Sequence, residues 1–289
     1  MAIDPDKLLA LRFPEIRHSY DARTCILYAL GLGAGIDPLD ENQLKYVDET
    51  KLQAVPTMAN ILAYPGFWMR DLDTGIDWVR VVHGEHSTRL HRPLPTSGTI
   101  VGRSRIVDLI DKGEGRGALV YVERTIHDAD SDALIATLRQ TVFCRGDGGF
   151  GGRAGPTPTP HPTPERPADV TIEMPTHPQL ALIYRLSGDE NPLHCDPATA
   201  RKAGFDRPIL HGLATFGIAG NALVAACCDH DPERYLAIGG RFSAPVFPGE
   251  TISVEIWHEA AGRAAYRARV SARDVNVISN GWFEYTPQE

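Results

Sequence analysis

The sequence predicts an α+β fold that is built from two similar units in one chain. Each half contains a helix candidate followed by strand-like runs, and a segment rich in proline and glycine separates the halves. A helix with several antiparallel strands, repeated after a linker, is typical of a duplicated α+β unit. The length of 289 residues suits two units of ordinary size or one large domain.

The first half, residues 1–147, is expected to form the N-terminal unit. Its helix candidate runs from Thr57 to Tyr64 and is short, because Pro65-Gly66 stops it. The segment from Arg92 to Ile100 leads into alternating strands, and a turn at Gly113 to Gly117 separates two of them.

The second half, residues 169–289, follows a linker at residues 148–168. Successive prolines in the linker lack N–H donors and favour extended conformations. The second half has a much longer apolar helix candidate, from Leu213 to Cys228, and a strand from Ile252 to His258 that alternates clearly. Because the two helix candidates differ so much in length, we expect one half to bind and the other to react.

Composition and charge exclude several classes of protein. Hydrophobic residues make up 43% of the chain and charged residues 23%, which is typical of a globular protein. The net charge of -8 argues against a nucleic-acid partner, and no apolar run approaches the ~20 residues that span a bilayer. Five cysteines match no disulfide or zinc spacing, so we expect reduced thiols, a cytoplasmic location and no metal.

A carboxylate and an imidazole lie close together in the second half. Gly188 and Pro192 argue against a continuous helix here, so Asp189 and His194 lie on an irregular loop and can converge. Such a pair is the usual equipment of general acid–base catalysis. The alternative is an Asp-turn beside a hydrogen-bonded surface histidine, which is the commoner outcome for an isolated pair.

Gly212 stands at the beginning of the long apolar helix candidate. A helix N-terminus presents unpaired N–H groups, and glycine lets a ligand approach that backbone closely. The helix is apolar on nearly all sides and is therefore expected to be buried, where an N–H group stabilises an oxyanion more strongly. The alternative is that Gly212 is a plain helix cap.

These segments resemble a known family. Ser187 to His194 (SGDENPLH), followed by Ile209 to Gly212 (ILHG), resembles the hydratase 2 motif of MaoC-like proteins. The resemblance covers nearly the whole chain and is to the two-domain form found in multifunctional peroxisomal enzymes and in free-standing bacterial homologues. It implies an α+β double hot-dog fold, in which each half wraps an antiparallel sheet around a helix.

The resemblance also implies site residues. Asp189 and His194 would be the catalytic pair, with Gly212 as the oxyanion donor. The expected substrate-binding residues are Glu49, His83, Gly84, Lys112, Asn191 and Phe242. From the sequence alone, the alternatives are a solvated loop carboxylate for Glu49 and a solvated side chain for Lys112.

The reaction implied is hydration of a trans-2-enoyl-CoA to an (R)-3-hydroxyacyl-CoA, or its reverse, in fatty-acid or related acyl-CoA metabolism. No cofactor is expected, since CoA is part of the acyl-CoA thioester substrate, and neither a nucleic acid nor a membrane is an expected partner. We expect a homodimer. The alternatives are a hot-dog acyl-CoA thioesterase and a non-catalytic acyl-CoA-binding protein. The sequence leaves open the acyl group and which of Asp189 and His194 is the acid.

Overall fold

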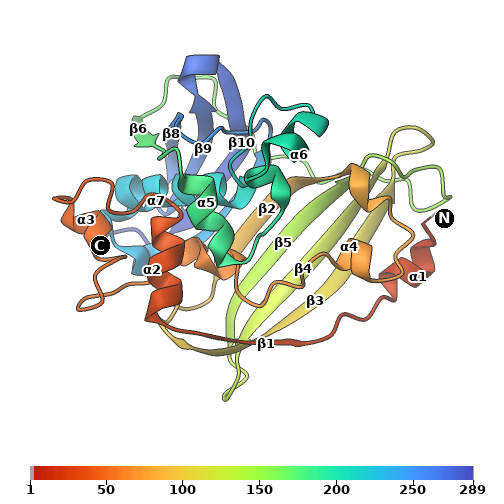
Figure 1. The fold of residues 1–289 in the computed structure, drawn as a ribbon, viewed down its shortest axis with the longest axis horizontal. Coiled ribbons are helices and arrows are strands. Elements are labelled where there is room, and N and C mark those ends of the chain that lie inside the picture. The colour runs from red at the N-terminus through yellow and green to blue at the C-terminus, as the bar shows by residue number, and fades with distance from the viewer. Residues whose placement is uncertain (1–2, 289) are drawn as a thin grey trace.

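Strand β2 (Val81–Leu90) of the first half pairs with strand β7 (Tyr235–Phe242) of the second half and joins the two halves. In the computed structural model, which describes residues 3–288, this pair is antiparallel, with Glu85 opposite Arg241 and Arg89 opposite Ala237. The result is one antiparallel sheet of ten strands in the order β1-β3-β4-β5-β2-β7-β10-β9-β8-β6 (Figure 1).

The two separate sheets expected from the sequence are therefore replaced by a single continuous sheet. The physical reason is that β2 and β7 would otherwise be edge strands with unpaired backbone N–H and C=O groups. When the two strands pair, each supplies the hydrogen-bond partners that the other needs. The remaining strands of the first half are β1 (Ile16–Tyr20), β3 (Gly98–Asp111), β4 (Ala118–Asp128) and β5 (Leu134–Cys144). Those of the second half are β6 (Val170–Pro175), β8 (Thr251–Ala260), β9 (Arg263–Val270) and β10 (Val275–Tyr285).

The long apolar helix predicted from Leu213 to Cys228 is confirmed as α7 (Gly212–Cys228), one residue longer at its beginning. It is buried on nearly all sides and contacts strands β6, β7, β8 and β10 of the second half. The helix ends at Cys228, and its C-cap residue, Asp229, adopts the left-handed conformation. A helix without a polar face must be enclosed, so α7 is the centre of the larger hydrophobic core.

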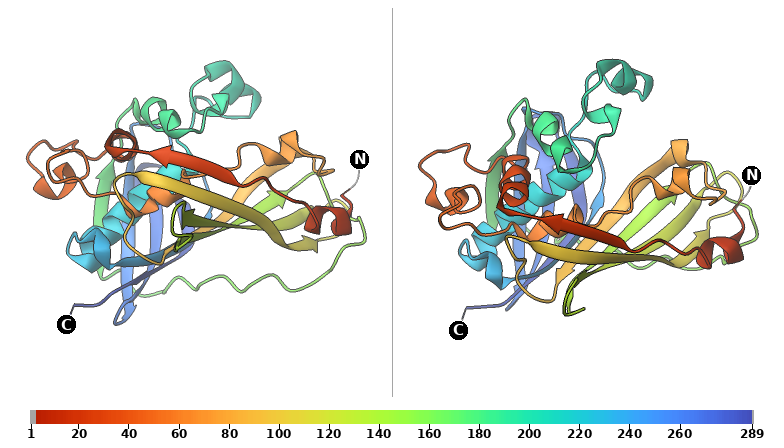
Figure 2. Two further views of the ribbon diagram at one scale, coloured as in Figure 1. Left: turned by 90° about the horizontal axis from the view of Figure 1, so that it is seen from below. Right: turned by 60° about the horizontal axis from the view of Figure 1, so that its bottom comes forward.

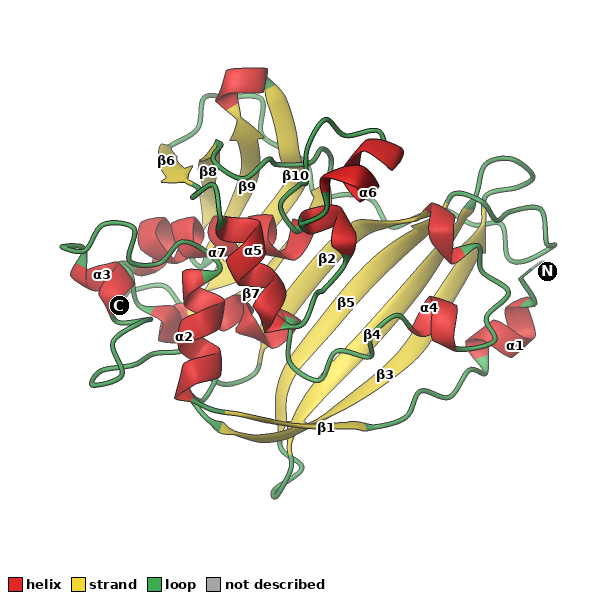
Figure 3. Cartoon of the chain, in the orientation of Figure 1, coloured by secondary structure: helices red, strands yellow, loops and turns green. Residues whose placement is uncertain are grey.

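The helix expected from Thr57 to Tyr64 is shorter and tighter than predicted. It is the 3-10 helix η1 (Pro56–Asn60), followed by a turn before Pro65. Its residues are buried against α7, and the Tyr28 hydroxyl on helix α2 (Ala22–Leu30) donates to the Thr57 carbonyl oxygen at 2.9 Å. The helices crowd around the second half, while few cross strands β3, β4 and β5 (Figure 3).

The other helical segments are short. The α-helices are α1 (Pro5–Leu9), α3 (Glu41–Leu44), α4 (Trp68–Asp71), α5 (Leu180–Tyr184) and α6 (Pro197–Lys202). The 3-10 helices are η2 (Trp78–Arg80), η3 (Arg185–Ser187), η4 (Pro192–His194), η5 (Pro232–Arg234) and η6 (Ser271–Arg273). Within residues 3–288, none is both long and apolar enough to cross a membrane.

The segment at residues 148–168 has neither helix nor strand and runs as a long loop beside the sheet (Figure 2). Backbone carbonyl groups tie it to the second half. The Asn280 side chain donates to the His161 carbonyl at 2.8 Å, and the Trp257 indole donates to the Arg166 carbonyl at 2.8 Å. The extended path therefore follows from its prolines and is fixed by side chains of the sheet.

Close packing of α7 against η1 generates a stability prediction. A Cβ atom on Gly220 would lie 2.9 Å from the Thr57 methyl group. Gly220→Val should therefore lower the free energy of unfolding by about 1–3 kcal/mol, the usual effect of overpacking. Chemical unfolding followed by circular dichroism measures this. The control is Gly155→Val in the linker, where the nearest atom lies at 3.6 Å; equal stability of both variants would contradict the prediction.

Candidate active site

A short irregular loop between α5 and α6 carries the Asp189–His194 pair. The chain turns at Gly188, whose φ of 113° is in the region that favours glycine. The Asn191 side chain then caps η4 by accepting from the Leu193 N–H at 3.0 Å, and the Asp189 carboxylate accepts from the Asn191 N–H at 3.2 Å. These local bonds hold Asp189 and His194 on one side of the loop.

His194 is held in one tautomer. Its Nδ1–H donates to the Ile209 carbonyl oxygen at 2.8 Å, which leaves Nε2 with a free lone pair. The side chain is only 8% exposed, and burial lowers its pKa from the ordinary value. His194 is therefore neutral near pH 7 and can accept a proton at Nε2.

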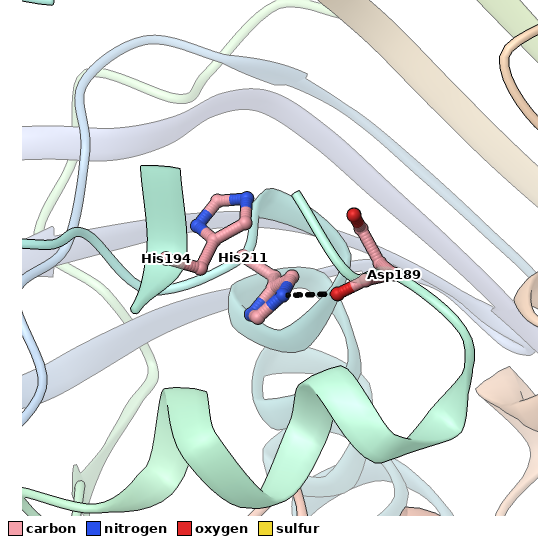
Figure 4. Close-up of side chains that lie close together, drawn as sticks. All are labelled: Asp189, His194 and His211. Carbon is pink, nitrogen blue, oxygen red and sulfur yellow. Dashed lines mark hydrogen bonds between the residues drawn. The ribbon is translucent and has the colours of Figure 1, made fainter. Parts of the chain in front are cut away.

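His211 stacks on His194 and was not assigned a role from the sequence. The two rings lie 3.7 Å apart at 28°, and the His211 Nε2–H donates to the Asp189 carbonyl oxygen at 3.1 Å. Burial and the neighbouring His194 lower the pKa of His211 to about 4. Its position directly before Gly212 in the motif was the available signal. His211 connects the two catalytic candidates through one contact to each (Figure 4).

Side-chain ligand atoms of Asp189, His194 and His211 lie within 4.8 Å of one another. Within residues 3–288 this is the one group of three such side chains with the composition of a metal site. The imidazole N–H groups of His194 and His211 donate to backbone carbonyl oxygens. This arrangement is found both in metal ligands and in acid–base catalysts.

Gly212 is the first residue of α7 and faces the ring of Phe242. A Cβ atom there would lie 3.4 Å from that ring. The preceding residue, His211, provides no side-chain cap for the helix. The Gly212 N–H is thus one of the first-turn donors without an intrahelical partner, at the positive end of a buried helix.

A cavity of about 810 Å³ brings residues of both halves together. It is lined by eight of the nine expected site residues: His83, Gly84, Lys112, Asp189, Asn191, His194, Gly212 and Phe242. The ninth, Glu49, lies on an exposed turn after α3 and does not line this cavity.

The first half contributes a bulge in β2 to this cavity. The pairing of β2 with β5 shifts between His83 and Glu85, so Gly84 is the extra residue. The His83 ring packs edge-on against Phe242 at 4.8 Å, and burial lowers its pKa to about 4. Bulges are common beside active sites because they redirect a side chain and free backbone groups.

Lys112 lies where β3 ends, at another part of the cavity lining. Its ammonium group is 5.2 Å from the centre of the Phe143 ring. The neighbouring Asp111 accepts backbone N–H bonds from Gly113, Gly149 and Gly151, which ties the start of the linker to this strand. Lys112 is therefore a cation on a rigid turn at the cavity.

This geometry can support proton transfer beside a carbonyl group. A neutral imidazole and a carboxylate provide acid–base groups, and the N–H of Gly212 can donate to an oxygen that gains negative charge. All three lie in a partly enclosed site, where such interactions are stronger than in water.

Comparisons with known proteins follow this division of the chain. Residues 18–146 match the MFE-2 hydratase 2 N-terminal domain, and residues 159–280 match the MaoC like domain. The chain is 41% identical to 3-hydroxyacyl-thioester dehydratase Y of Mycobacterium tuberculosis, covering 99% of each protein. It is 38% identical to enoyl-CoA hydratase ChsH3 of the same organism, covering 97% of this chain and 98% of that protein.

Solved structures are similar too. The MaoC-like dehydratase from Phytophthora capsici has a TM-score of 0.85 at 33% identity, covering 98% of this chain and 99% of the other. A conserved hypothetical protein of Mycobacterium tuberculosis, described as a double hot-dog fold, has a TM-score of 0.56 at 15% identity, covering 100% and 97%. The second likeness concerns the fold alone, and it supports a hot-dog architecture.

The buried histidines predict how stability depends on pH. Burial lowers the pKa of His83 and His211 to about 4 and that of His86 well below 6.5. The unfolded chain takes up these protons as pH falls below about 6.5, whereas the folded chain stays neutral until lower pH. The stability that comes from keeping these histidines neutral is therefore complete above pH 6.5. Below this pH the free energy of unfolding should decrease, by up to about 1.4 kcal/mol per pH unit for each histidine.

Urea unfolding at several pH values between neutral and pH 5 measures this slope. The His83→Gln variant should reduce the slope by about one proton, because one depressed pKa is removed. A stability that is flat over this range, or a variant with the same slope as the original protein, would contradict the assignment.

Proposed function

Because this chain belongs to the MaoC-like dehydratase family in its two-domain hydratase 2 form, we propose that it hydrates trans-2-enoyl-CoA to (R)-3-hydroxyacyl-CoA, or catalyses the reverse dehydration. The observation that carries the proposal is the convergence of Asp189, His194 and the N-terminus of α7 at Gly212 on one cavity. Two relatives that align over nearly their whole length are named as a dehydratase and a hydratase of such thioesters, which supports it.

In the proposed mechanism, a water molecule is held between Asp189 and His194. His194 is the base, because its Nδ1–H is committed to the Ile209 carbonyl and Nε2 is free to accept. The water oxygen bonds to the β-carbon while Nε2 takes one proton, and that proton is then delivered to the α-carbon. Both parts of the water are thus added to one face, and Asp189 orients the water and stabilises the imidazolium that forms.

The thioester itself activates the double bond, so the proposal includes no metal and no redox cofactor. As the water attacks, negative charge moves to the thioester oxygen, and the Gly212 N–H stabilises this enolate. The bond strengthens as charge develops, which favours the transition state over the bound substrate.

The proposed division of labour follows the halves. Residues 1–147 would bind acyl-CoA through His83, Gly84 and Lys112, with Lys112 as a contact for CoA phosphate. Residues 169–289 would carry the chemistry, with Asn191 holding the loop and Phe242 packing beside Gly212. Glu49 is left out of the proposed site because it does not line the cavity. A homodimer in the cytoplasm stays a prediction from the sequence.

An assay with crotonyl-CoA tests the proposal. Loss of the enoyl absorbance without release of free thiol is the expected result. Release of thiol would instead identify a thioesterase. Binding with neither change, across enoyl-CoAs of several lengths, would identify a non-catalytic acyl-CoA-binding protein.

Substitution of the catalytic pair should remove most of the activity. Asp189→Asn and His194→Gln should each lower kcat by about 100-fold or more, the usual contribution of a general acid or base. Circular dichroism verifies that each variant is folded. Near-normal turnover in either folded variant would show that the residue has been assigned wrongly.

Gly212 offers a test that separates a catalytic role from a structural one. Gly212→Val should lower kcat by about 100-fold, because a displacement of ~1 Å between reacting groups has an effect of this size. The fold should tolerate the change, since Gly212 has no left-handed backbone and a Cβ there comes to 3.4 Å of a movable Phe242 ring.

The matched control is Gly212→Ala, which should show a smaller loss of kcat with the same melting temperature. A helix cap alone predicts a small stability change and normal kinetics for both variants. Unchanged kcat in a stable Gly212→Val protein would therefore remove this N–H from the mechanism.

A further inference from the structure

A buried arginine lines the proposed substrate cavity in the first half. Arg124 lies on β4, is only 7% exposed, and lines the same cavity as Asp189 and His194. A fully buried arginine is unusual in a cavity that is expected to receive a hydrocarbon chain, because burial of an unpaired charge is costly.

The guanidinium of Arg124 is only partly satisfied by the protein. One nitrogen donates to the Asn60 carbonyl oxygen at 2.7 Å, and the group lies 5.5 Å from the centre of the Tyr64 ring. Its Nε–H has no hydrogen-bond partner. In the part of the chain that the structure describes, no aspartate or glutamate forms an ion pair with it.

Another arginine of this protein shows the contrast. Arg273 makes two hydrogen bonds to the Glu250 carboxylate, at 2.6 and 2.9 Å. Arg124 is more deeply buried and lacks such a partner. Burial lowers the pKa of Arg124 to about 10, so the guanidinium keeps its charge at neutral pH.

A second donor without a partner lies beside Arg124. The Asn60 side chain uses its oxygen to accept from His86 Nε2 at 3.0 Å and from the Thr88 hydroxyl. Its amide nitrogen has no partner, although Asn60 is 1% exposed and lines the cavity. The cavity wall therefore contains two buried hydrogen-bond donors, one of them charged, that have no acceptor among the described residues of the protein.

Tyr64 connects this cluster with the catalytic loop. Burial raises its pKa, the nearby Asp189 carboxylate raises it further, and Arg124 lowers it. Tyr64 thus lies beside Arg124 and lines the same cavity as Asp189. Gly212, Asp189 and Arg124 all line one cavity, so an acyl group whose thioester lies beside Gly212 shares this cavity with Arg124.

We propose that Arg124, with Asn60, binds a carboxylate carried by the acyl group, so that the preferred substrates are enoyl-CoA thioesters with a second, free carboxylate away from the thioester. This inference rests on the proposed function and names its substrate class. A carboxylate has two oxygens, which match the fork of a guanidinium and supply the missing negative charge.

The experiment compares matched pairs of substrates. Enoyl-CoAs of increasing chain length are prepared with either a terminal carboxylate or a terminal methyl group, and kcat/KM is measured for each. At one or more lengths the carboxylate should be preferred at least about tenfold. The Arg124→Met variant should lose this preference by about 10- to 100-fold, the range expected when a charge-assisted hydrogen bond is lost.

The preference is expressed as the ratio of the two kcat/KM values, so a general loss of activity or of folded protein cancels. Arg103→Met is the control, because Arg103 lies on the neighbouring strand β3 and pairs with Glu15 and Asp132 outside the cavity. It should keep the ratio of the original protein. Arg124→Lys should keep part of it, since the charge remains but the fork is lost.

The outcomes separate this inference from the proposed function. Hydration of both series with no preference at any length would overturn the inference about Arg124 but would still support the proposed hydratase activity. An equal ratio in Arg124→Met and the original protein would assign Arg124 the purely structural role of binding the Asn60 carbonyl. Calorimetry with saturated acyl-CoAs, with and without the carboxylate, measures the same preference when no hydration occurs, and equal affinities there would also overturn it.

Discussion

Burial of α7 is the constraint on which the rest of this structure depends. The helix has no polar face, so the strands of the second half, together with α2 and η1 of the first, must surround it. Its N-terminus cannot then lie in bulk water and instead opens at Gly212 into the cavity. The loop with Asp189 and His194 is held against that end by the bonds to Ile209 and from His211. Core packing and the placement of the site thus have the same origin.

The two halves differ where the function requires it. The second half packs a helix of 17 residues against its sheet, whereas the helix candidate of the first half is only the five-residue η1. The cavity extends into this first half. The short helix of the first half therefore leaves space for a substrate. Arg124 makes part of the wall of that space polar.

Local features of the sequence predicted the loop and the helix that form the candidate site, and long-range pairing explains the contacts that were not predicted. Gly188, Pro192 and the cap at Asn191 act within a few residues, so the irregular loop could be predicted, and the continuous apolar run predicted α7. The pairing of β2 with β7 and the stacking of His211 on His194 join segments that are distant or separated by a loop. No local pattern encodes these contacts, although the position of His211 beside Gly212 in the motif marked the residue itself. Glu49 was assigned by resemblance alone, and its exposed turn gives no contact with the cavity.

The strand pair between β2 and β7 restricts how the molecule can move. A hinge that parts the two halves would break backbone bonds from Glu85 to Arg89, and the buried contact of η1 with α7 would separate with them. Separation of the halves is therefore a costly route for substrate entry and product release, and smaller movements of loops at the cavity are favoured. Exchange of substrate and product would then depend on local movements near the opening, while the continuous ten-stranded sheet keeps the two halves in register.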